Sequence, residues 1–304
     1  MNHNALSFAL LTMMMLTCCD AQEPDSHGTR NWESGKHTLM VDGLERTFVL
    51  DRPRQLKPRA ALVLVFHGFT SSAEEIRKAS GFASLAEQHG FVVVYPQGSL
   101  DDQGRSFFNV GYAFHADSKV DDVRFMKTVV DRLVNDLKLD NRSVFATGMS
   151  NGGDMSFYLA SQPKPMVKAI APIAGTMMSS WSKDFAPPSR TSIMAVHGTQ
   201  DDVTLWNGDL ENRDGWGAYL GIETVVDLWT SGLALEALEV SERKDKTPPR
   251  NAKVILKRWS TKADSTEVLF YQLIGGGHDW PKHLVNKQLS TADEVWAFFT
   301  KHIN

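Results

Sequence analysis

The segment 148–152 (GMSNG) places a serine, Ser150, between glycines in the pattern G-x-S-x-G. Residues 143–147 before it are typical of a buried strand, and a helix is expected to begin just after Ser150. On such a sharp turn the serine adopts a strained backbone conformation, and the glycines let neighbouring backbone approach. An isolated motif of this kind is commonly a glycine-rich helix start with a capping serine. The strand before it and the helix after it favour Ser150 as a nucleophile.

A histidine is needed next, because a serine hydroxyl is a poor nucleophile until a base removes its proton. Among the ten histidines, His278 follows an expected strand at 268–273 and stands directly after three glycines, residues 275–277. A loop of this composition can carry the ring over the edge of a sheet toward Ser150. We therefore predict His278 as the general base.

Four other histidines are candidates for the same role. His197 ends an expected strand but is followed at once by an acidic turn. His67 ends the first central strand, where a structural role or a role in the oxyanion loop is more natural. His283 and His302 lie in segments that resemble solvent-facing surface.

An acid is expected in the turn 197–202 (HGTQDD), directly after an expected strand at 192–196. Asp201 would accept the second N–H of the His278 imidazole, fix its tautomer and stabilise the imidazolium. A plain pair of turn-forming aspartates is the alternative interpretation, and Asp202 competes with Asp201 for the catalytic role. We favour Asp201.

Two backbone amides are candidates for the oxyanion hole, which needs preorganised hydrogen-bond donors. The N–H of Asn151 follows the nucleophile and lies at a helix N-terminus, where the helix dipole favours negative charge. The second donor is expected in the loop 67–70 (HGFT), and Phe69 N–H is the better candidate there.

The elements that must position these residues alternate between strands and helices. A hairpin is expected over residues 38–50 with its turn at Asp42-Gly43. Further strands are expected at 60–66, 91–95, 143–147, 169–173, 192–196, 253–259 and 268–273, and helices at 72–89, from 121 or 122 to 137, after 150, and at 292–302. Apolar strands without polar alternation are typical of a parallel sheet that is covered on both faces. The order predicts an α/β fold with a mostly parallel, doubly wound sheet and helices on both faces. Residues 241–251 are expected to form an exposed loop.

The length and charge of the chain limit its domain count and its partners. A chain of 304 residues with 42% hydrophobic residues can bury one sizeable core, so we expect one catalytic domain, residues 37–304. The formal net charge of -4 gives no electrostatic reason to expect nucleic acid or anionic lipid as a partner. The expected substrate is neutral or small.

The N-terminus is predicted to be an export signal over residues 1–19, followed by a flexible leader over 20–36 that contains Trp32. Residues 5–16 form an apolar run that is too short to span a bilayer. Both cysteines, Cys18 and Cys19, stand at the end of this run, so no disulfide is expected in the folded domain. Two interpretations remain open: Cys19 is a lipidated first residue that tethers the protein to a membrane, or both cysteines are incidental parts of a cleaved signal. Either predicts a periplasmic, extracellular or membrane-anchored protein.

These motifs together resemble the polyhydroxybutyrate depolymerase and feruloyl/acetylxylan esterase group of secreted α/β-hydrolases. The resemblance extends along nearly the whole mature chain through the segments HGF (67–69), YPQG (95–98), VDDVRF (120–125), VFATGMSNGGDM (144–155), HGTQDD (197–202), GGGHDWP (275–281) and EVWAFF (294–299). It implies the α/β-hydrolase fold, Ser150, Asp201 and His278 as a catalytic triad, and Phe69 and Asn151 as oxyanion donors. It also implies hydrolysis of feruloyl, acetyl or hydroxyalkanoate esters, with a small ester, a polysaccharide or a polyester as the substrate.

The chain departs from the pattern of this group at two places. Many relatives carry a cysteine after the His-Gly pair and use disulfides, whereas this chain has Phe69 there and no disulfide is expected. The usual Val-Pro-Tyr after the acid is replaced by residues 203–206 (VTLW). The second change affects a segment near the expected cleft, so it bears on the identity of the substrate and not on the chemistry.

Tryptophans in predicted loops are candidates for substrate contacts, because flat aromatic faces stack on a sugar or a phenolic acyl group. Trp181, Trp206, Trp216 and Trp280 lie in such loops. For any one of them a role as core or loop anchor is the ordinary interpretation. We select Trp280, beside the catalytic loop, and Trp206 as substrate-binding residues, and residues 206–221 as a loop that borders the cleft.

No phosphate-binding loop, dinucleotide fingerprint or metal-ligand spacing is found in the sequence, so neither a cofactor nor a metal is expected. Two alternatives to the esterase remain. The same triad serves a peptidase or a thioesterase, and only a panel of substrates separates these. A surface-anchored binding lipoprotein that has lost turnover is the alternative from another class. The intact Ser, Asp, His and oxyanion segments argue against it.

Overall fold

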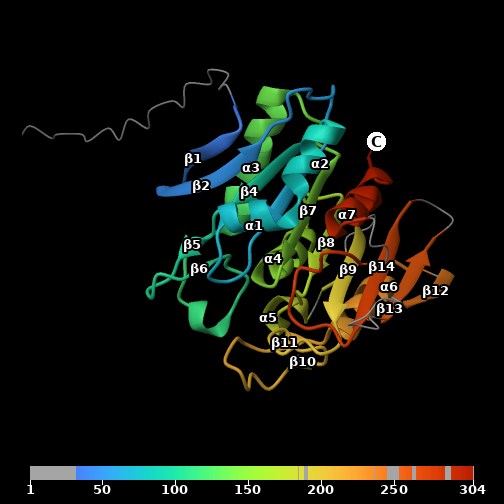
Figure 1. The fold of residues 1–304 in the computed structure, drawn as a ribbon. Helices are drawn as coiled ribbons and strands as arrows, with labels where there is room; N and C mark the ends of the chain where they lie inside the picture. Colours follow the sequence, from blue (N-terminus) through green and yellow to red (C-terminus); the bar gives the residue numbers. More distant parts are fainter. Residues whose placement is uncertain are drawn as a thin grey trace, which may run out of the picture. The chain divides into compact units, whose positions relative to one another are not determined.

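A ten-stranded sheet forms the centre of the fold (Figure 1). The computed structural model describes residues 32–183, 185–187, 191–235, 237–244, 253–261, 265–284 and 289–303, all within one compact unit, Asn31–Asn304. The strands of the sheet follow each other in the order β1-β2-β4-β3-β7-β8-β9-β14-β13-β12. Their bounds are β1 Gly35–Val41, β2 Leu44–Asp51, β3 Leu62–Phe66, β4 Val92–Pro96, β7 Val144–Met149, β8 Ala169–Ile173, β9 Ser192–Gly198, β12 Ala237–Lys244, β13 Lys253–Ser260 and β14 Glu267–Ile274.

The strands that carry the candidate residues run parallel. Strands β4, β3, β7, β8, β9 and β14 form this central part, and β1 and β2 at one edge and β13 and β12 at the other are joined to it by antiparallel pairing. Because the carboxyl ends of parallel strands meet at one edge of a sheet, the loops after β3, β7, β9 and β14 are brought to the same end. The predicted mostly parallel sheet is confirmed.

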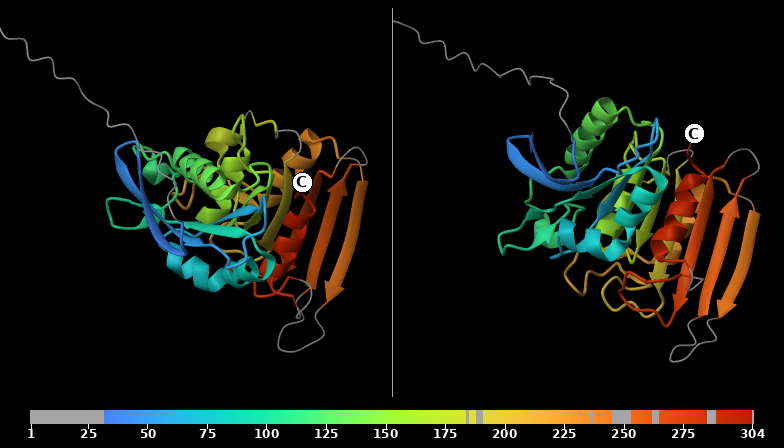
Figure 2. Two further views of the ribbon diagram at one scale, coloured as in Figure 1. Left: turned by 90° about the horizontal axis from the view of Figure 1, so that it is seen from above. Right: turned by 45° about the horizontal axis from the view of Figure 1, so that its top comes forward.

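Helices cover both faces of the sheet (Figure 2). Their bounds are α1 Ala73–Ser80, α2 Phe82–His89, α3 Asp122–Leu137, α4 Asn151–Ala160, α5 Ser179–Ser182, α6 Ile222–Gly232 and α7 Thr291–Thr300, with one 3-10 turn, η1 Ala113–His115. One buried cluster joins the sheet to α3, α4 and α6, and a second joins its other face to α1, α2 and α7. Within β3, Leu62, Leu64 and Phe66 belong to the first cluster, whereas Val63 and Val65 belong to the second. This alternation explains why the sequence of β3 is apolar at every position.

Two short hairpins lie outside the main sheet. Strands β5 (Ser99–Leu100) and β6 (Ser106–Phe107) form one of them, and β10 (Gly208–Asp209) and β11 (Tyr219–Leu220) form the other. The second hairpin occupies most of the segment predicted as a loop at the border of the cleft.

Local sequence signals set several boundaries where they were expected. The hairpin β1-β2 turns at Asp42-Gly43, both with positive φ. The side chain of Asp121 caps α3 by accepting a hydrogen bond from Arg124 N–H. The single helix predicted over 72–89 is instead two, because Gly81 adopts φ 82° and ends α1 where α2 begins.

Two sequence-based predictions at the borders of the domain are wrong. Trp32 does not belong to a flexible leader: its side chain is fully buried, its indole N–H donates to Asp136 at 2.7 Å, and β1 begins already at Gly35. Residues 241–244 belong to the edge strand β12 and not to a loop. Leu238 and Val240 are exposed and alternate with polar residues on an edge strand, so the sequence of β12 carries only a weak signal for a buried strand.

His302 is also misplaced by the sequence. It was assigned to solvent-facing surface, but its side chain is buried beside Phe298, with Nε2 3.9 Å from a carboxylate oxygen of Glu267. Helix α6 was not predicted. The remainder of the predicted loop, residues 245–251, and the N-terminal segment with Cys18 and Cys19 lie outside the described residues.

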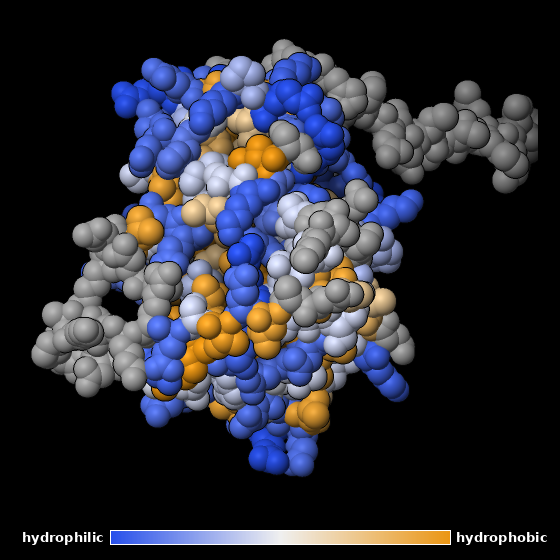
Figure 3. Space-filling view, turned by 90° about the vertical axis from the view of Figure 1, so that its right-hand side faces the viewer, coloured by the Kyte–Doolittle hydropathy of each residue, from blue (hydrophilic) through white to orange (hydrophobic). Residues whose placement is uncertain are grey.

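The sheet edge formed by β12 faces the viewer in Figure 3, where hydrophobic side chains are interspersed with hydrophilic ones. Leu238 and Val240 of β12 are among the exposed hydrophobic residues. Among the described helices, none is both long enough and apolar enough to cross a membrane.

The burial of Trp32 predicts that the stable domain begins before residue 37. Trp32→Ala should lower the free energy of unfolding by about 3–5 kcal/mol, because it leaves a cavity and removes the hydrogen bond to Asp136. Met40→Ala, in the β1-β2 hairpin that follows Trp32 and 62% exposed, should change it by less than about 0.5 kcal/mol. Urea denaturation followed by tryptophan fluorescence and circular dichroism measures both. If both substitutions change the free energy of unfolding by the same small amount, Trp32 is part of a flexible leader.

Burial lowers the pKa of His302 to about 4, which makes stability depend on pH. Below pH about 6.5 the unfolded chain binds a proton at this residue and the folded chain does not, so stability falls as the pH drops from about 6.5 toward 4. His302→Phe keeps the ring and removes the ionisation. Its free energy of unfolding should therefore fall less over this range, by up to about 3 kcal/mol, in urea titrations at several pH values. Parallel pH profiles for the two proteins would contradict the assignment.

Candidate active site

Ser150 occupies a strained turn between β7 and α4. Its φ of 57° and ψ of -124° lie outside the regions that residues with a side chain ordinarily adopt. The backbone is held there from both sides, since Ser150 N–H donates to the carbonyl of Ile173 at 2.9 Å and Asp154 N–H donates to the carbonyl of Ser150 at 2.9 Å. The turn presents the hydroxyl at the end of the sheet and places it at the N-terminus of α4.

The glycines around Ser150 are required by close backbone contacts. A Cβ atom on Gly148 would lie 2.5 Å from the carbonyl oxygen of Gly152, and a Cβ on Gly152 would lie 2.4 Å from the carbonyl oxygen of Phe66. A Cβ on Gly153 would come within 2.9 Å of the carbonyl oxygen of Ile173. The steric reason inferred from the motif therefore applies at each of these positions.

The loop after β3 passes directly beside the serine. A Cβ on Gly68 would lie 3.5 Å from the Cβ of Ser150, so Gly68 is adjacent to the serine. Phe69 N–H donates to no group in the described part of the chain, whereas the next two amides, of Thr70 and Ser71, donate to the carbonyls of Ser106 and Gly68. The N–H predicted as an oxyanion donor is thus free to bind an oxygen near Ser150.

His67 holds this loop in place and is fully buried. Gly98 N–H donates to its Nε2 at 3.0 Å, so the ring proton lies on Nδ1, which donates to the carbonyl of Gly68 at 2.7 Å. Burial lowers the pKa of His67 to about 4, and the neutral tautomer is the one that these bonds require. Its role is structural, which is one of the roles foreseen for it.

The side chain of Asn151 has a role that the sequence did not reveal. Its Oδ1 accepts from Phe108 N–H at 2.7 Å, and its Nδ2 donates to the carbonyl of Phe108 at 3.0 Å. This fully buried pair of bonds joins the start of α4 to the segment after β6. No local sequence signal links residues 43 positions apart, so only the structure could show it.

Asp201 and His278 are brought together by the loops after β9 and β14. Nδ1 of His278 lies 3.0 Å and 2.9 Å from the two carboxylate oxygens of Asp201. The two loops are themselves joined, because Gln200 N–H donates to the carbonyl of Gly276 at 2.8 Å and Gly275 N–H donates to the Thr199 hydroxyl at 2.8 Å. The competing acid, Asp202, is exposed.

The carboxylate of Asp201 is buried and kept ionised. Burial by itself raises its pKa, but the hydrogen bond and charge of His278 and the N–H of Val203 more than offset this and hold the pKa below its usual range. Thr204 N–H donates to the same oxygen at 2.8 Å. His197 lies behind this group, where its Nε2–H donates to the carbonyl of Thr204 at 2.8 Å. His197 therefore supports the acid turn, with its Nε2 3.6 Å from a carboxylate oxygen of Asp201.

The serine, acid and histidine lie at the ends of strands that are close in the sheet. Strands β7, β8, β9 and β14 are consecutive neighbours, and Ser150, Asp201 and His278 follow β7, β9 and β14. No hydrogen bond joins the Ser150 hydroxyl to His278 in the described part of the chain. Hydrogen bonds of this kind are commonly long or poorly aligned before substrate binds.

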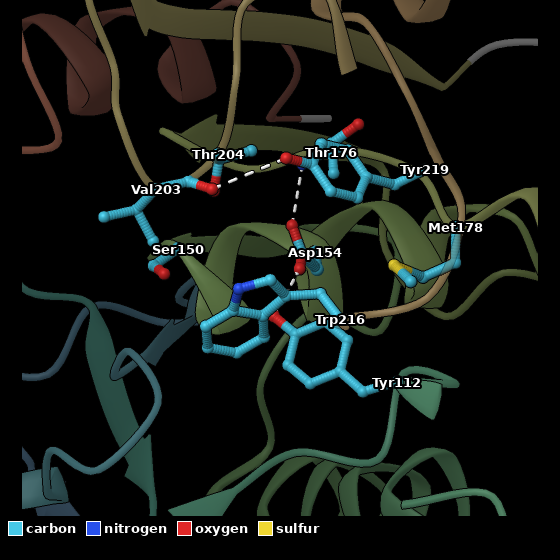
Figure 4. A pocket seen from close by; sticks show the side chains of 9 residues that line it. All are labelled: Tyr112, Ser150, Asp154, Thr176, Met178, Val203, Thr204, Trp216 and Tyr219. Carbon is cyan, nitrogen blue, oxygen red and sulfur yellow. Dashed lines mark hydrogen bonds between the residues drawn. The ribbon is translucent and has the colours of Figure 1, made fainter. Parts of the chain in front are cut away.

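A narrow pocket opens beside Ser150 (Figure 4). It is lined by Tyr112, Ser150, Asp154, Thr176, Met178, Val203, Thr204, Trp216 and Tyr219. Its walls are mostly apolar or aromatic, as in typical small-molecule sites, and its cavity volume of about 20 Å³ leaves room for one small group.

Asp154 is the buried acid of this pocket and was not selected from the sequence. It lies one helical turn after Ser150, accepts the Tyr112 hydroxyl at 2.6 Å and accepts Thr176 N–H at 2.7 Å. Burial raises its pKa to about 7, although both hydrogen bonds favour the ionised form. The signal available in the sequence was an acidic residue on an otherwise apolar helix.

The two tryptophans selected from the sequence do not line this pocket. Trp280 is half-buried against the cluster that contains α7. Trp206 stacks on Phe270 with ring centroids 5.5 Å apart and touches the ring of His197 edge-on. Trp216, which was among the wider set of candidates, contributes the aromatic wall.

Comparison with known proteins identifies the family. The sequence profile described as "Esterase PHB depolymerase" matches residues 48–226, which include Ser150, Phe69 and the acid turn. The chain belongs to the esterase PHB depolymerase family. His278 lies beyond the matched range, in a loop hydrogen-bonded to the matched acid turn.

Several curated proteins are similar to this member of the esterase PHB depolymerase family. A bifunctional acetylxylan esterase/xylanase of Neocallimastix patriciarum is 29% identical over 53% of this chain and 22% of its own length. Poly(3-hydroxyalkanoate) depolymerase C of Paucimonas lemoignei is 28% identical over 58% of this chain and 41% of its own length. A probable feruloyl esterase C of Aspergillus clavatus is 28% identical over 66% of this chain and 70% of its own length. The chain thus spans less than half the length of the first two.

Solved structures agree on the fold. An acetyl xylan esterase from Aspergillus awamori superposes with a TM-score of 0.61 at 17% identity, covering 88% of this chain and 99% of that one. A Bacillus cereus carboxylesterase gives a TM-score of 0.54 at 11% identity, covering 85% and 95%. The α/β-hydrolase fold expected for this family is therefore confirmed.

The close contacts at Gly152 predict that this position accepts no side chain. Gly152→Ala should lower the free energy of unfolding by about 1–3 kcal/mol or more, because its Cβ would meet backbone carbonyls of β3 and the following loop that cannot move independently. Gly277→Ala is the matched control, since a Cβ there meets nothing within 4 Å. Thermal and urea denaturation measure the difference. An alanine at 152 that is tolerated as well as one at 277 would contradict the steric account.

Proposed function

We propose that this protein is a serine carboxylic-ester hydrolase that works through an acyl-Ser150 intermediate. The observation that carries the proposal is the pair of short contacts between Asp201 and Nδ1 of His278, on loops at the same end of the parallel sheet as the strained Ser150 turn. Membership of a family of esterases supports the same reaction.

In the proposed reaction, Nε2 of His278 takes the proton of the Ser150 hydroxyl as the oxygen attacks the ester carbonyl. The Asp201 carboxylate stabilises the imidazolium that forms and holds Nδ1–H toward itself. The tetrahedral oxyanion is bound by the N–H groups of Phe69 and Asn151, the second of which is aided by the dipole of α4. His278 then gives the proton to the departing alcohol. Water repeats the sequence on the acyl-enzyme and releases the acid.

The proposed substrates are feruloyl, acetyl or hydroxyalkanoate esters, in small molecules or in a polysaccharide or polyester. The names of the similar proteins cover these classes. We further propose that the protein is exported by the signal at residues 1–19, that Cys19 is available as a lipid anchor, and that Trp32 marks the start of the catalytic domain. The contacts made by Trp216 in the pocket make it a stronger proposal for substrate binding than Trp280 or Trp206.

The proposed triad predicts a strong and specific effect of two substitutions. Ser150→Ala should abolish hydrolysis of short p-nitrophenyl esters and labelling by a fluorophosphonate probe, with an unchanged circular dichroism spectrum. Asp201→Asn keeps the size of the acid but removes its charge, so kcat should fall on the order of 10³–10⁴-fold. Asp202→Asn, at the exposed neighbour, should lower kcat by less than about threefold. Residual turnover in a folded Ser150→Ala protein, or equal effects at 201 and 202, would reject the assignment.

A further inference from the structure

The carboxyl group of Asp154 lies in the pocket beside Ser150 and has no part in the proposed triad reaction. Residues 150 and 154 are four positions apart at the start of α4, so their Cα atoms are separated by about 6 Å along the helix axis. The Asp154 side chain belongs to the pocket lining together with Ser150, although the residue as a whole is only 3% exposed. A group attached to an ester that is bound at Ser150 can therefore reach it.

The two hydrogen bonds of Asp154 leave it able to accept more. Oδ2 receives the Tyr112 hydroxyl and Oδ1 receives Thr176 N–H, as Figure 4 shows. Above its pKa of about 7 the Asp154 carboxyl is ionised and has about four lone-pair sites on its two oxygens, so about two remain for a ligand. Tyr112 and Thr176 both donate to the carboxylate, so they fix its orientation and leave some of its lone pairs free to accept further hydrogen bonds.

Among the residues that line the pocket, Asp154 supplies the carboxyl group. Met178, Val203 and Trp216 present apolar or aromatic surface, and Thr176, Thr204 and Tyr219 contribute hydroxyl-bearing side chains. Placing a carboxyl group in such surroundings is costly, and the raised pKa of Asp154 reflects this cost. Asp154 connects Tyr112 to Thr176, which is one reason for an acidic residue at this position. An amide side chain, however, could make the same connection without a charge.

We propose that Asp154 is a specificity-determining residue that accepts a hydrogen bond from a hydroxyl group on the ester substrate. The pocket would then select esters that carry a hydroxyl on the part that enters it. This inference rests on the proposed function of Ser150, because it concerns the substrate of that same site.

A hydroxyl fits the charges around the pocket better than an ammonium group does. The Asp154 carboxyl interacts electrostatically with both His278 and Asp201, and it faces the hydroxyl of Tyr112. During the proposed reaction His278 becomes a cation, so a substrate cation in the pocket would oppose the charge that must form. A neutral donor has no such effect.

The experiment compares esters that differ in a single group. The acyl-side set is ethyl 3-hydroxybutyrate, ethyl 3-methylbutyrate and ethyl 3-aminobutyrate, and the alcohol-side set is 2-hydroxyethyl butyrate and propyl butyrate. In wild-type protein, kcat/KM for the hydroxyl ester should exceed that of its methyl counterpart roughly ten- to hundredfold in one of the two sets. Hydrolysis of the methyl esters tests the proposed function separately, because it does not require Asp154 to recognise a hydroxyl.

Two variants test whether the preference for the hydroxyl ester depends on the Asp154 carboxylate. Asp154→Asn can still satisfy Tyr112 and Thr176, but its Nδ2 replaces one acceptor oxygen and the charge is removed, which leaves a single neutral acceptor site, so the hydroxyl-to-methyl ratio of kcat/KM should fall at least about tenfold, toward one. If Asp154 has only a structural role, the substitution should lower kcat/KM for both esters by the same factor and leave their ratio unchanged. Tyr112→Phe removes a donor and frees one acceptor site, so it should keep the preference.

The outcomes are distinct. A hydroxyl preference that is lost in Asp154→Asn and kept in Tyr112→Phe supports the proposal. The absence of a preference in both substrate sets, a preference that survives in Asp154→Asn, or its loss in Tyr112→Phe overturns it. A preference for the amino ester overturns it in favour of a cation site. If wild-type protein cleaves none of the esters while it remains folded, the proposed function itself fails.

Discussion

The close approach of backbone around Ser150 is the constraint on which the rest of the structure depends. Strand β3, the Ser150 turn and the first turn of α4 touch without intervening side chains, because Gly148 and Gly152 have no Cβ atoms. The serine can hold an unfavourable φ only because its neighbours are fixed on every side. The sheet supplies this fixation: β3 and β8 flank β7 with regular parallel pairing, and the two core clusters press helices against both faces.

Much of this arrangement could be predicted from the sequence, because the signals are local. The apolar runs of β3, β4 and β8 and the capping residue Asp121 are readable within a few positions. The candidate Ser150 is readable for the same reason, since the steric demand that shapes its turn falls on its immediate neighbours. Asp201 and His278 were placed by their position after strands, and the structure brings their side chains into contact.

The features that were missed depend on contacts between distant residues. Trp32 looks like part of a polar leader until the hairpin and α3 close over it. His302 ends a surface-like segment, yet Phe298 and Glu267 enclose it. The pocket is an extreme case, because its lining comes from segments on either side of α4 and from the acid turn. Trp216 and Asp154 acquire a shared role only when these segments meet.

The two hydrogen bonds between Asn151 and Phe108 join the start of α4 to the segment after β6. Without them, changes in loop length could alter the distance between these two parts. A change of length in the chain between β6 and α3 cannot displace Phe108 without pulling on the first residue of α4. Variation of the pocket surface is therefore expected mainly from the replacement of side chains such as Tyr112 on a backbone of fixed course. The same limit applies to the segment between the acid turn and α6, because Ala113 N–H donates to the carbonyl of Trp216 at 2.9 Å and joins this segment to the one after β6.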